Sequence, residues 1–422
     1  MTASHGAMRR CAGAARTDAT EVAPAVGFGA AAAPSVSPAS DMPFVLVGAG
    51  ETLVAGGALS SVGEGPEPLG ARVRRLLAEG EGPDLVVGAL PFGASAPAHL
   101  YRPAALSRHP GRGGFAAAMP LPRRAESLRP ARWQVTPEPP LAAYQTAVAA
   151  ALARMSQGGE GLRKIVLSRS LKIIADRLID ATALLRALAQ DESVTAFCVP
   201  LPSTGAPRAL VGATPELLVS RRGARVTSHP LAGSSRRARE AGADHAAAQA
   251  LLGSEKDRRE HREVVAAILD QLAPHCTDLA APGEPELTST ASMWHLGTPI
   301  TGRLRDASLS ALDLALLLHP TPAVCGTPRN AAAAAIAELE GYERGFYAGA
   351  VGWCEASGDG DWHVAIRCAE LSGREARLYA GAGIVAGSDP VAEGEETSAK
   401  FAALLTALGI DEKGNPVAEE RA

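Results

Sequence analysis

The chain has 422 residues, of which 46% are hydrophobic and 20% are charged, a composition typical of a globular protein. Its 41 Lys and Arg residues against 45 Asp and Glu residues give a net charge of −4, which argues against a nucleic-acid binder because such a protein needs a basic surface. No stretch approaches the roughly 18 continuous apolar residues of a membrane-spanning helix, so we expect no membrane segment. The six cysteines are scattered without Cys-x-x-Cys spacing, which predicts reduced thiols in a cytoplasmic protein.

Composition changes near both ends of the chain. Residues 1–41 are dominated by Ala, Gly, Ser and Pro with little to bury, so we expect a low-complexity, disordered segment. Regular apolar patterns begin at Phe44, and no internal repeat or linker interrupts the stretch to residue 412. We therefore predict one large domain over residues 42–412, followed by a short tail at 413–422.

The periodic segments alternate between strands and helices along the chain. Strand patterns lie at 44–47 and 85–92 with a helix at 71–77 between them, and residues 102–140, rich in Pro and Arg, predict an irregular connection. Further strands are expected at 163–169, 194–200, 208–213, 217–220, 226–228, 347–353, 362–371 and 376–385. Further helices are expected at 141–157, 180–190, 256–272, 308–318, 330–340 and 393–408. This order predicts an α+β fold with antiparallel hairpins and helices outside.

The last predicted helix begins with acidic residues that share one face. Glu393, Glu396 and Lys400 are spaced by three and four residues, so they lie along one side of the helix. An acidic first turn that interacts with the helix dipole is the alternative explanation. Glu260, on the inward edge of the amphipathic helix 256–272, would supply a second carboxylate, and such an oxygen-ligand site with open water positions suits Mg²⁺.

Two further features suggest a pocket for an anion. Arg367 lies in a predicted apolar strand, where its planar fork is either part of a salt bridge or a clamp for a carboxylate. The neighbouring strand carries Gly381 and Gly383, whose N–H groups are able to approach the same anion. His295, as a lone histidine, is more often a core or hydrogen-bonding residue than a catalyst.

Lys164 and Glu216 each stand among apolar neighbours at the edge of a predicted strand. Burial lowers the pKa of a lysine and raises that of a glutamate, which would create a proton acceptor and a proton donor. From the residues alone, two surface charges are the more frequent explanation of such a pattern.

Together these residues resemble the chorismate-utilising enzymes, with the greatest likeness to isochorismate synthases. The resemblance covers residues 44–412 and rests on eight strings that occur in the family's order: KIVLSR at 164–169, TPELL at 214–218, PLAGS at 230–234, KDRREH at 256–261, LHPTPA at 318–323, GWC at 352–354, AIRCA at 365–369 and AGAGIV at 380–385. It implies a single large α+β domain in which two stacked, mostly antiparallel sheets lie inside helices.

The resemblance also implies an activity and a set of site residues. The activity is the Mg²⁺-dependent isomerisation of chorismate to isochorismate, in which water adds at ring carbon 2 and the hydroxyl at carbon 4 leaves. Lys164 would be the general base and Glu216 the general acid, while Glu260 and Glu396, with Glu393 nearby, would bind Mg²⁺. The substrate-binding residues carried over are Arg367, Tyr347, Gly381, Ala382, Gly383, His295, Ala323, Gly233, Ser234 and Lys400.

The chorismate-utilising families differ at a few sequence positions, and these differences help to choose among their activities. Aminodeoxychorismate synthases place a nucleophilic lysine where Ala232 stands, and anthranilate synthases lack a basic residue that matches Lys164. Salicylate synthases share Lys164 and Glu216 but lack the LHPTPA string, so salicylate formation, the same first step followed by pyruvate loss, is the main alternative. A non-catalytic chorismate-binding subunit is a further alternative.

The expected small-molecule partner is therefore chorismate, and relatives of this type are commonly monomeric, so we expect a monomer. Isochorismate feeds siderophore, salicylate and menaquinone biosynthesis, and the residues do not distinguish these routes.

Overall fold

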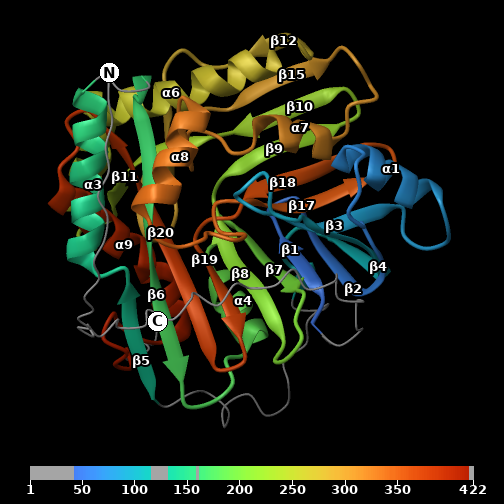
Figure 1. The fold of residues 1–422 in the computed structure, drawn as a ribbon, viewed down its shortest axis with the longest axis horizontal. Coiled ribbons are helices and arrows are strands. Elements are labelled where there is room, and N and C mark those ends of the chain that lie inside the picture. The colour runs from blue at the N-terminus through green and yellow to red at the C-terminus, as the bar shows by residue number, and fades with distance from the viewer. Residues whose placement is uncertain (1–41, 116–131, 158–160, 418–422) are drawn as a thin grey trace, which may run out of the picture. The chain divides into compact units, whose positions relative to one another are not determined.

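The computed structural model describes residues 42–115, 132–157 and 161–417. The predicted low-complexity segment 1–41 lies outside these ranges, as do residues 418–422 of the predicted tail. The described residues belong to one compact α+β unit, as the sequence predicted (Figure 1).

Strand β1 (Phe44–Val47) joins two halves of one large antiparallel sheet. It pairs with β2 (Glu51–Ser61) on one edge and with β7 (Thr195–Leu201) on the other. We call the strands reached through β2 the first arm and those reached through β7 the second arm. All strand pairings in the described ranges are antiparallel, and 17 strands are connected in this way.

The strand order follows from the pairings. Beyond β2, the first arm contains β4 (His99–Pro110), β3 (Leu85–Leu90), β17 (Ala350–Glu355), β18 (Gly360–Val364), β9 (Leu217–Arg222), β10 (Arg225–His229), β15 (Ile300–Leu304) and β12 (Cys276–Ala280). Beyond β7, the second arm contains β8 (Arg208–Thr214), β19 (Cys368–Ser372), β20 (Glu375–Val385) and β6 (Lys164–Ala175), with β5 (Trp133–Glu138) and β16 (Gly326–Thr327) on the far edge of β6.

The two arms contribute to one hydrophobic core. Phe197 and Leu210 of the second arm belong to the same buried cluster as Trp353 and Trp362 of the first arm. This arrangement corresponds to the stacked sheets expected from the resemblance, although hydrogen bonds through β1 make the two sheets continuous. A strand that is buried on both faces has a continuous run of apolar residues in its sequence, as β3 does, because neither face contacts water.

Helices cover the sheets. Those that pack against the second arm are α3 (Leu141–Ser156), α4 (Ala181–Leu188), α8 (Arg329–Leu339) and α9 (Pro390–Leu408), whereas α1 (Leu69–Ala78) and α7 (Ala311–Leu318) pack against the first arm (Figure 1). None of the helices in the described ranges combines the length and apolar character needed to cross a bilayer.

A smaller sheet lies beside the large one. It contains β11 (Leu231–Arg236), β14 (Met293–Gly297) and β13 (Glu286–Ser289), and helices α5 (Ala241–Gly253) and α6 (Glu255–Leu272) pack on it. Neither this sheet nor α5 was predicted from the sequence, because the strands are short and α5 is mostly Ala, Gly and Leu without a clear polar face.

Two local predictions were wrong. Residues 102–140 are not an irregular connection throughout, because β4 continues to Pro110 and β5 occupies Trp133–Glu138. The predicted strand 362–371 is two strands, β18 and β19, with Arg367 between them at a left-handed φ of 50°. The chain leaves the sheet at this point, which carries the Arg367 side chain away from the apolar strand assumed from its neighbours.

Candidate functional site

The free edge of β20 forms one wall of a pocket. β19 pairs with β20 only as far as Leu378, so Tyr379 to Val385 have β6 as their strand partner within the described chain. Across from Gly381 and Gly383, the N–H groups of Ser168 and Val166 donate away from β20, to Glu340 and Cys325. These are therefore the non-hydrogen-bonded pairs of the ladder, and the N–H and C=O groups of both glycines point off the free edge.

The same glycines make room for neighbouring side chains. A Cβ atom at Gly383 would lie 2.1 Å from Oε1 of Glu260, and one at Gly381 would lie 2.9 Å from the Tyr347 hydroxyl. Ala382 points the other way, into the apolar cluster between β20 and the helices. The alternation along β20 thus places the glycines toward the pocket and the apolar side chains toward the helices.

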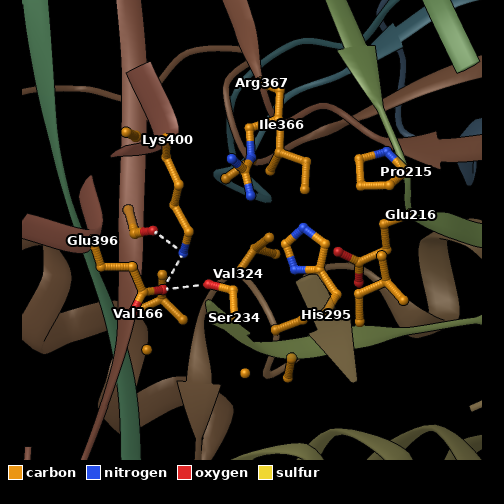
Figure 2. A pocket seen from close by; sticks show the side chains of 18 of the residues that line it. Val166, Pro215, Glu216, Ser234, His295, Val324, Ile366, Arg367, Glu396 and Lys400 are labelled. Carbon is orange, nitrogen blue, oxygen red and sulfur yellow. Dashed lines mark hydrogen bonds and ion pairs between the residues drawn. The ribbon is translucent and has the colours of Figure 1, made fainter. Parts of the chain in front are cut away.

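Helix α9 brings a charged pair to this wall. Lys400 donates to the carbonyl of Gly381 at 2.9 Å and to Oε1 of Glu396 at 2.5 Å, and Ser234 from β11 donates to the same oxygen at 2.7 Å (Figure 2). Burial alone would raise the pKa of Glu396, but Lys400 and Ser234 outweigh it and keep that pKa below its ordinary value. Glu396 is therefore held as a carboxylate.

Arg367 and His295 lie between the two ends of the pocket. Figure 2 shows Lys400, Glu396 and Ser234 on one side and Glu216 with Pro215 on the other, with the Arg367 guanidinium and the His295 ring between them. The pKa of Arg367 is lowered by burial, and that of His295 lies well below its usual value because of burial and the charges of Arg367 and Lys400. Nε2 of the neutral His295 is buried without a protein partner, so it is free to bond to a ligand.

Glu216 and Lys164 are both buried, contrary to the surface positions that residue statistics favoured. Glu216 is 3% exposed in the loop between β8 and β9, and burial raises the pKa of its carboxyl from 4.5 to about 8. Lys164 is fully buried at the start of β6, with Nζ 3.1 Å from Oε1 of Glu260. The Nζ atom makes no hydrogen bond of good geometry. With its pKa raised to about 8, the Glu216 carboxyl keeps its proton at neutral pH.

The three predicted metal-binding carboxylates each contact a lysine. Glu260 is paired with Lys164, Glu396 with Lys400, and Glu393 with Lys256 at 2.6 Å. In the described ranges no group of three His, Cys, Asp or Glu side chains is already arranged to hold a metal ion.

The same carboxylates nevertheless fit a hard cation in their chemistry. Burial and the nearby charge of Glu396 raise the pKa of Glu393, and one of its buried oxygens, Oε2, has no hydrogen-bond partner. Crowded buried carboxylates with an unsatisfied oxygen are the donors that Mg²⁺ prefers. Glu260 and Glu396 line the pocket, whereas Glu393 does not.

Most of the predicted residues meet in this one pocket. The lining includes twelve of them: Glu216, Gly233, Ser234, Glu260, His295, Ala323, Tyr347, Arg367, Gly381, Gly383, Glu396 and Lys400. The other three predicted residues, Lys164, Ala382 and Glu393, do not line the pocket. Lys164 contacts the lining residue Glu260, and Glu393 is close enough to the lining residue Glu396 to be affected by its charge. The space measures about 680 Å³ including its open mouth and the solvent there.

Several lining residues were not predicted. Val166, Val324, Ile366 and Tyr379 lie in or next to the quoted strings, but apolar and aromatic residues carry no chemical signal that separates a pocket wall from a core. Tyr379 stacks on Tyr347 with ring centroids 4.7 Å apart and planes 8° apart. The alternation of β20, which places Tyr379 on the same face as both glycines, was the available signal.

Comparison with known proteins places the chain in a family. The family described as "Chorismate binding enzyme" matches residues 119–409, and the chain therefore belongs to the chorismate-binding enzymes. DhbC of Bacillus subtilis, named an isochorismate synthase, is 43% identical over 354 residues, covering 82% of this chain and 87% of DhbC. MenF of Mycobacterium tuberculosis is 46% identical over 376 residues, covering 88% and 97% of the two chains.

A solved structure agrees with these matches. The crystal structure of DhbC from Bacillus anthracis superposes with a TM-score of 0.80 at 38% identity, covering 88% of this chain and 97% of that one. The fold predicted from the sequence is therefore that of an established structural family.

Proposed function

We propose that this protein is an isochorismate synthase, an isomerase that converts chorismate to isochorismate. The observation that carries the proposal is the convergence of a buried acid, two cationic side chains and a set of acidic residues on one pocket. The relatives named as isochorismate synthases match most of the chain, which supports the same activity here.

The pocket offers separate binding groups for the two carboxylates of chorismate. The enolpyruvyl carboxylate would contact Arg367 and the N–H groups that point off β20 at Gly381 and Gly383. Tyr347, which lies beside Gly381, would close this end of the pocket. The ring carboxylate would lie near Glu260 and Glu396, where a bound Mg²⁺ would supply the positive charge that two anionic groups need in order to approach each other.

Lys164 and Glu216 would act on opposite sides of the substrate ring. A water molecule near Lys164 would give up a proton to the amine as its oxygen bonds to ring carbon 2. The ring double bonds shift, the bond between carbon 4 and its hydroxyl breaks, and Glu216 supplies the proton with which that oxygen leaves as water. The raised pKa of Glu216 keeps this proton in place at neutral pH, and burial keeps bulk water from competing.

Salicylate formation requires pyruvate to be lost after the same first step. The sequence carries the LHPTPA string that salicylate synthases lack, and DhbC of Bacillus subtilis, which matches most of this chain, is named an isochorismate synthase. A non-catalytic chorismate-binding subunit would tolerate loss of the acid, the base or the carboxylates, but all of them are present here.

Incubating the purified protein with chorismate and Mg²⁺ and separating the products by chromatography tests the proposal. Isochorismate should be the main product, and a chelator should abolish the reaction. Salicylate and pyruvate as main products would replace the assignment with a salicylate synthase, and binding without turnover would favour the non-catalytic subunit.

A further inference from the structure

Strand β6 lacks a strand partner over a short part of its outer edge. β16 pairs with Lys164 and Ile165, and β5 pairs from Ser170 onward, so residues 166–169 face neither strand. The backbone groups of Val166 and Ser168 point to this open edge, opposite Gly383 and Gly381 across the ladder. Buried backbone groups need partners, so something other than a strand must satisfy them.

A buried ion pair fills this opening. Glu340, at the C-terminal end of α8, and Arg344, four residues later in the following loop, have side chains 1% and 2% exposed and bind each other in a bidentate manner at 2.5 and 2.8 Å. Oε1 of Glu340 accepts from the Ser168 N–H at 2.6 Å and from its hydroxyl at 2.8 Å. Nη2 of Arg344 donates to the carbonyl of Val166 at 2.7 Å. Together with the carbonyl of Cys325, which accepts from the Val166 N–H, the pair takes the place of a missing strand.

Arg344 also connects this opening to a second wall of the pocket. Its Nη1 donates to the carbonyl of Val324 at 2.7 Å, while Nη2 holds Val166, and both valines line the pocket. The guanidinium lies over the ring of Tyr347 at 5.8 Å, and the Tyr342 hydroxyl is 2.6 Å from the Ser168 hydroxyl on the other side. One planar group therefore sets the separation of β6, the 321–325 loop and Tyr347.

We propose that the Glu340–Arg344 pair is a positioning element for the reaction, although neither side chain lines the pocket. It fixes β6, which carries Lys164 two residues before Val166, relative to the loop that carries Ala323 and Val324. A buried ion pair is a poor source of stability, since desolvation offsets its attraction, so its geometry is the property that apolar residues could not replace. The inference rests on the proposed function, because the reacting group it positions is Lys164.

Arg344→Lys tests the inference without leaving a buried charge unpaired. Lysine keeps the charge opposite Glu340, but its compact ammonium cannot span the carbonyls of Val166 and Val324 together with both Glu340 oxygens. We expect kcat per folded molecule to fall by about 10- to 100-fold, because small displacements of reacting groups have effects of this size. KM should change by less than about 3-fold, since Arg344 bonds neither to Arg367 nor to the backbone of β20.

Arg112→Lys is the matched control. The Arg112 guanidinium also joins backbone carbonyls, those of Val194, Ala189 and Asp191, but it lies outside the pocket lining. Its replacement should lower the melting temperature and leave kcat per folded molecule unchanged. If Arg344→Lys behaves like this control, the pair is only structural and the inference is wrong.

Tyr342→Phe gives an independent measurement if Arg344→Lys does not fold. It removes only the hydroxyl that contacts Ser168, and we expect kcat to fall by about 3- to 10-fold with KM unchanged. An unchanged kcat in Tyr342→Phe would then overturn the inference. Activity of the wild-type protein is measured first: its absence would refute the proposed function, whereas wild-type turnover with unaffected variants would refute the positioning role alone.

Discussion

Replacing Glu216 with Gln separates the proton of this carboxyl from its shape. The wild-type side chain is buried, which raises its pKa from 4.5 to about 8, and the nearby positive charges of Lys164, Arg367 and Lys400 only partly oppose this effect. Gln fills nearly the same space but delivers no proton, so kcat should fall by about 10²- to 10⁴-fold. In the wild-type enzyme, kcat/KM should decrease about tenfold per pH unit above the pKa of Glu216, because the ionised acid is inactive.

The same pKa predicts how stability depends on pH. The folded pKa lies above the unfolded one, so the contribution of Glu216 to stability is fully present below about 4.5 and is lost as pH rises to about 8. At ~1.36 kcal/mol per pH unit, the total is roughly 5 kcal/mol, of which about 4 kcal/mol is lost between pH 5 and pH 9. Gln does not ionise and avoids this loss.

Urea denaturation of both proteins at several pH values between 5 and 9 measures the difference. The free energy of unfolding of Glu216→Gln minus that of the wild type should increase by about 4 kcal/mol as the pH is raised from 5 to 9. Glu64→Gln, at an exposed position, should show no such trend. A difference that stays constant within about 1 kcal/mol, together with a rate profile flat through pH 9, would refute the assignment of a protonated buried acid.

Three further predictions follow from the site and the core. Gly383→Ala places a Cβ 2.1 Å from Oε1 of Glu260, so the protein should fold but lose about 100-fold in activity and respond less to Mg²⁺ in a thermal-shift assay. The control is Gly56→Ala, whose new Cβ has nothing within 4 Å, and equal activity of the two variants would contradict the predicted crowding of Glu260. Lys164→Met should lower kcat by about 10²- to 10⁴-fold with KM nearly unchanged, and turnover above a tenth of wild type would remove its role as base. Phe401→Ala removes a fully buried ring from α9 and should lower the free energy of unfolding by about 3–5 kcal/mol in urea denaturation, whereas a loss below about 1 kcal/mol would mean that the site repacks.

The local patterns of the sequence determined most elements and much of the pocket. The period-2 alternation in β20 and the apolar stripe of α6 reflect which face of each element is buried. They can therefore be recognised in the sequence without knowing which element packs against that face. Glu260 could be placed on the inward edge of α6 for the same reason, and it is 7% exposed. The spacing of Glu393, Glu396 and Lys400 likewise placed them on one helical face, and two of the three line the pocket.

Only the tertiary structure decided the features that depend on distant segments. From the sequence, Arg367 looked like part of a continuous strand. In the structure β18 pairs with β9 and β19 pairs with β8, and Arg367 adopts a left-handed backbone conformation where the chain passes from one pairing to the other. The burial of Lys164 and Glu216 was equally unreadable, since a charged residue at a strand edge has the same sequence signature when it is exposed. The proposed roles of Glu340 and Arg344 depend on an opening at the edge of β6, whose contacts with them span 172 and 178 residues of the chain, and no local pattern encodes such an opening.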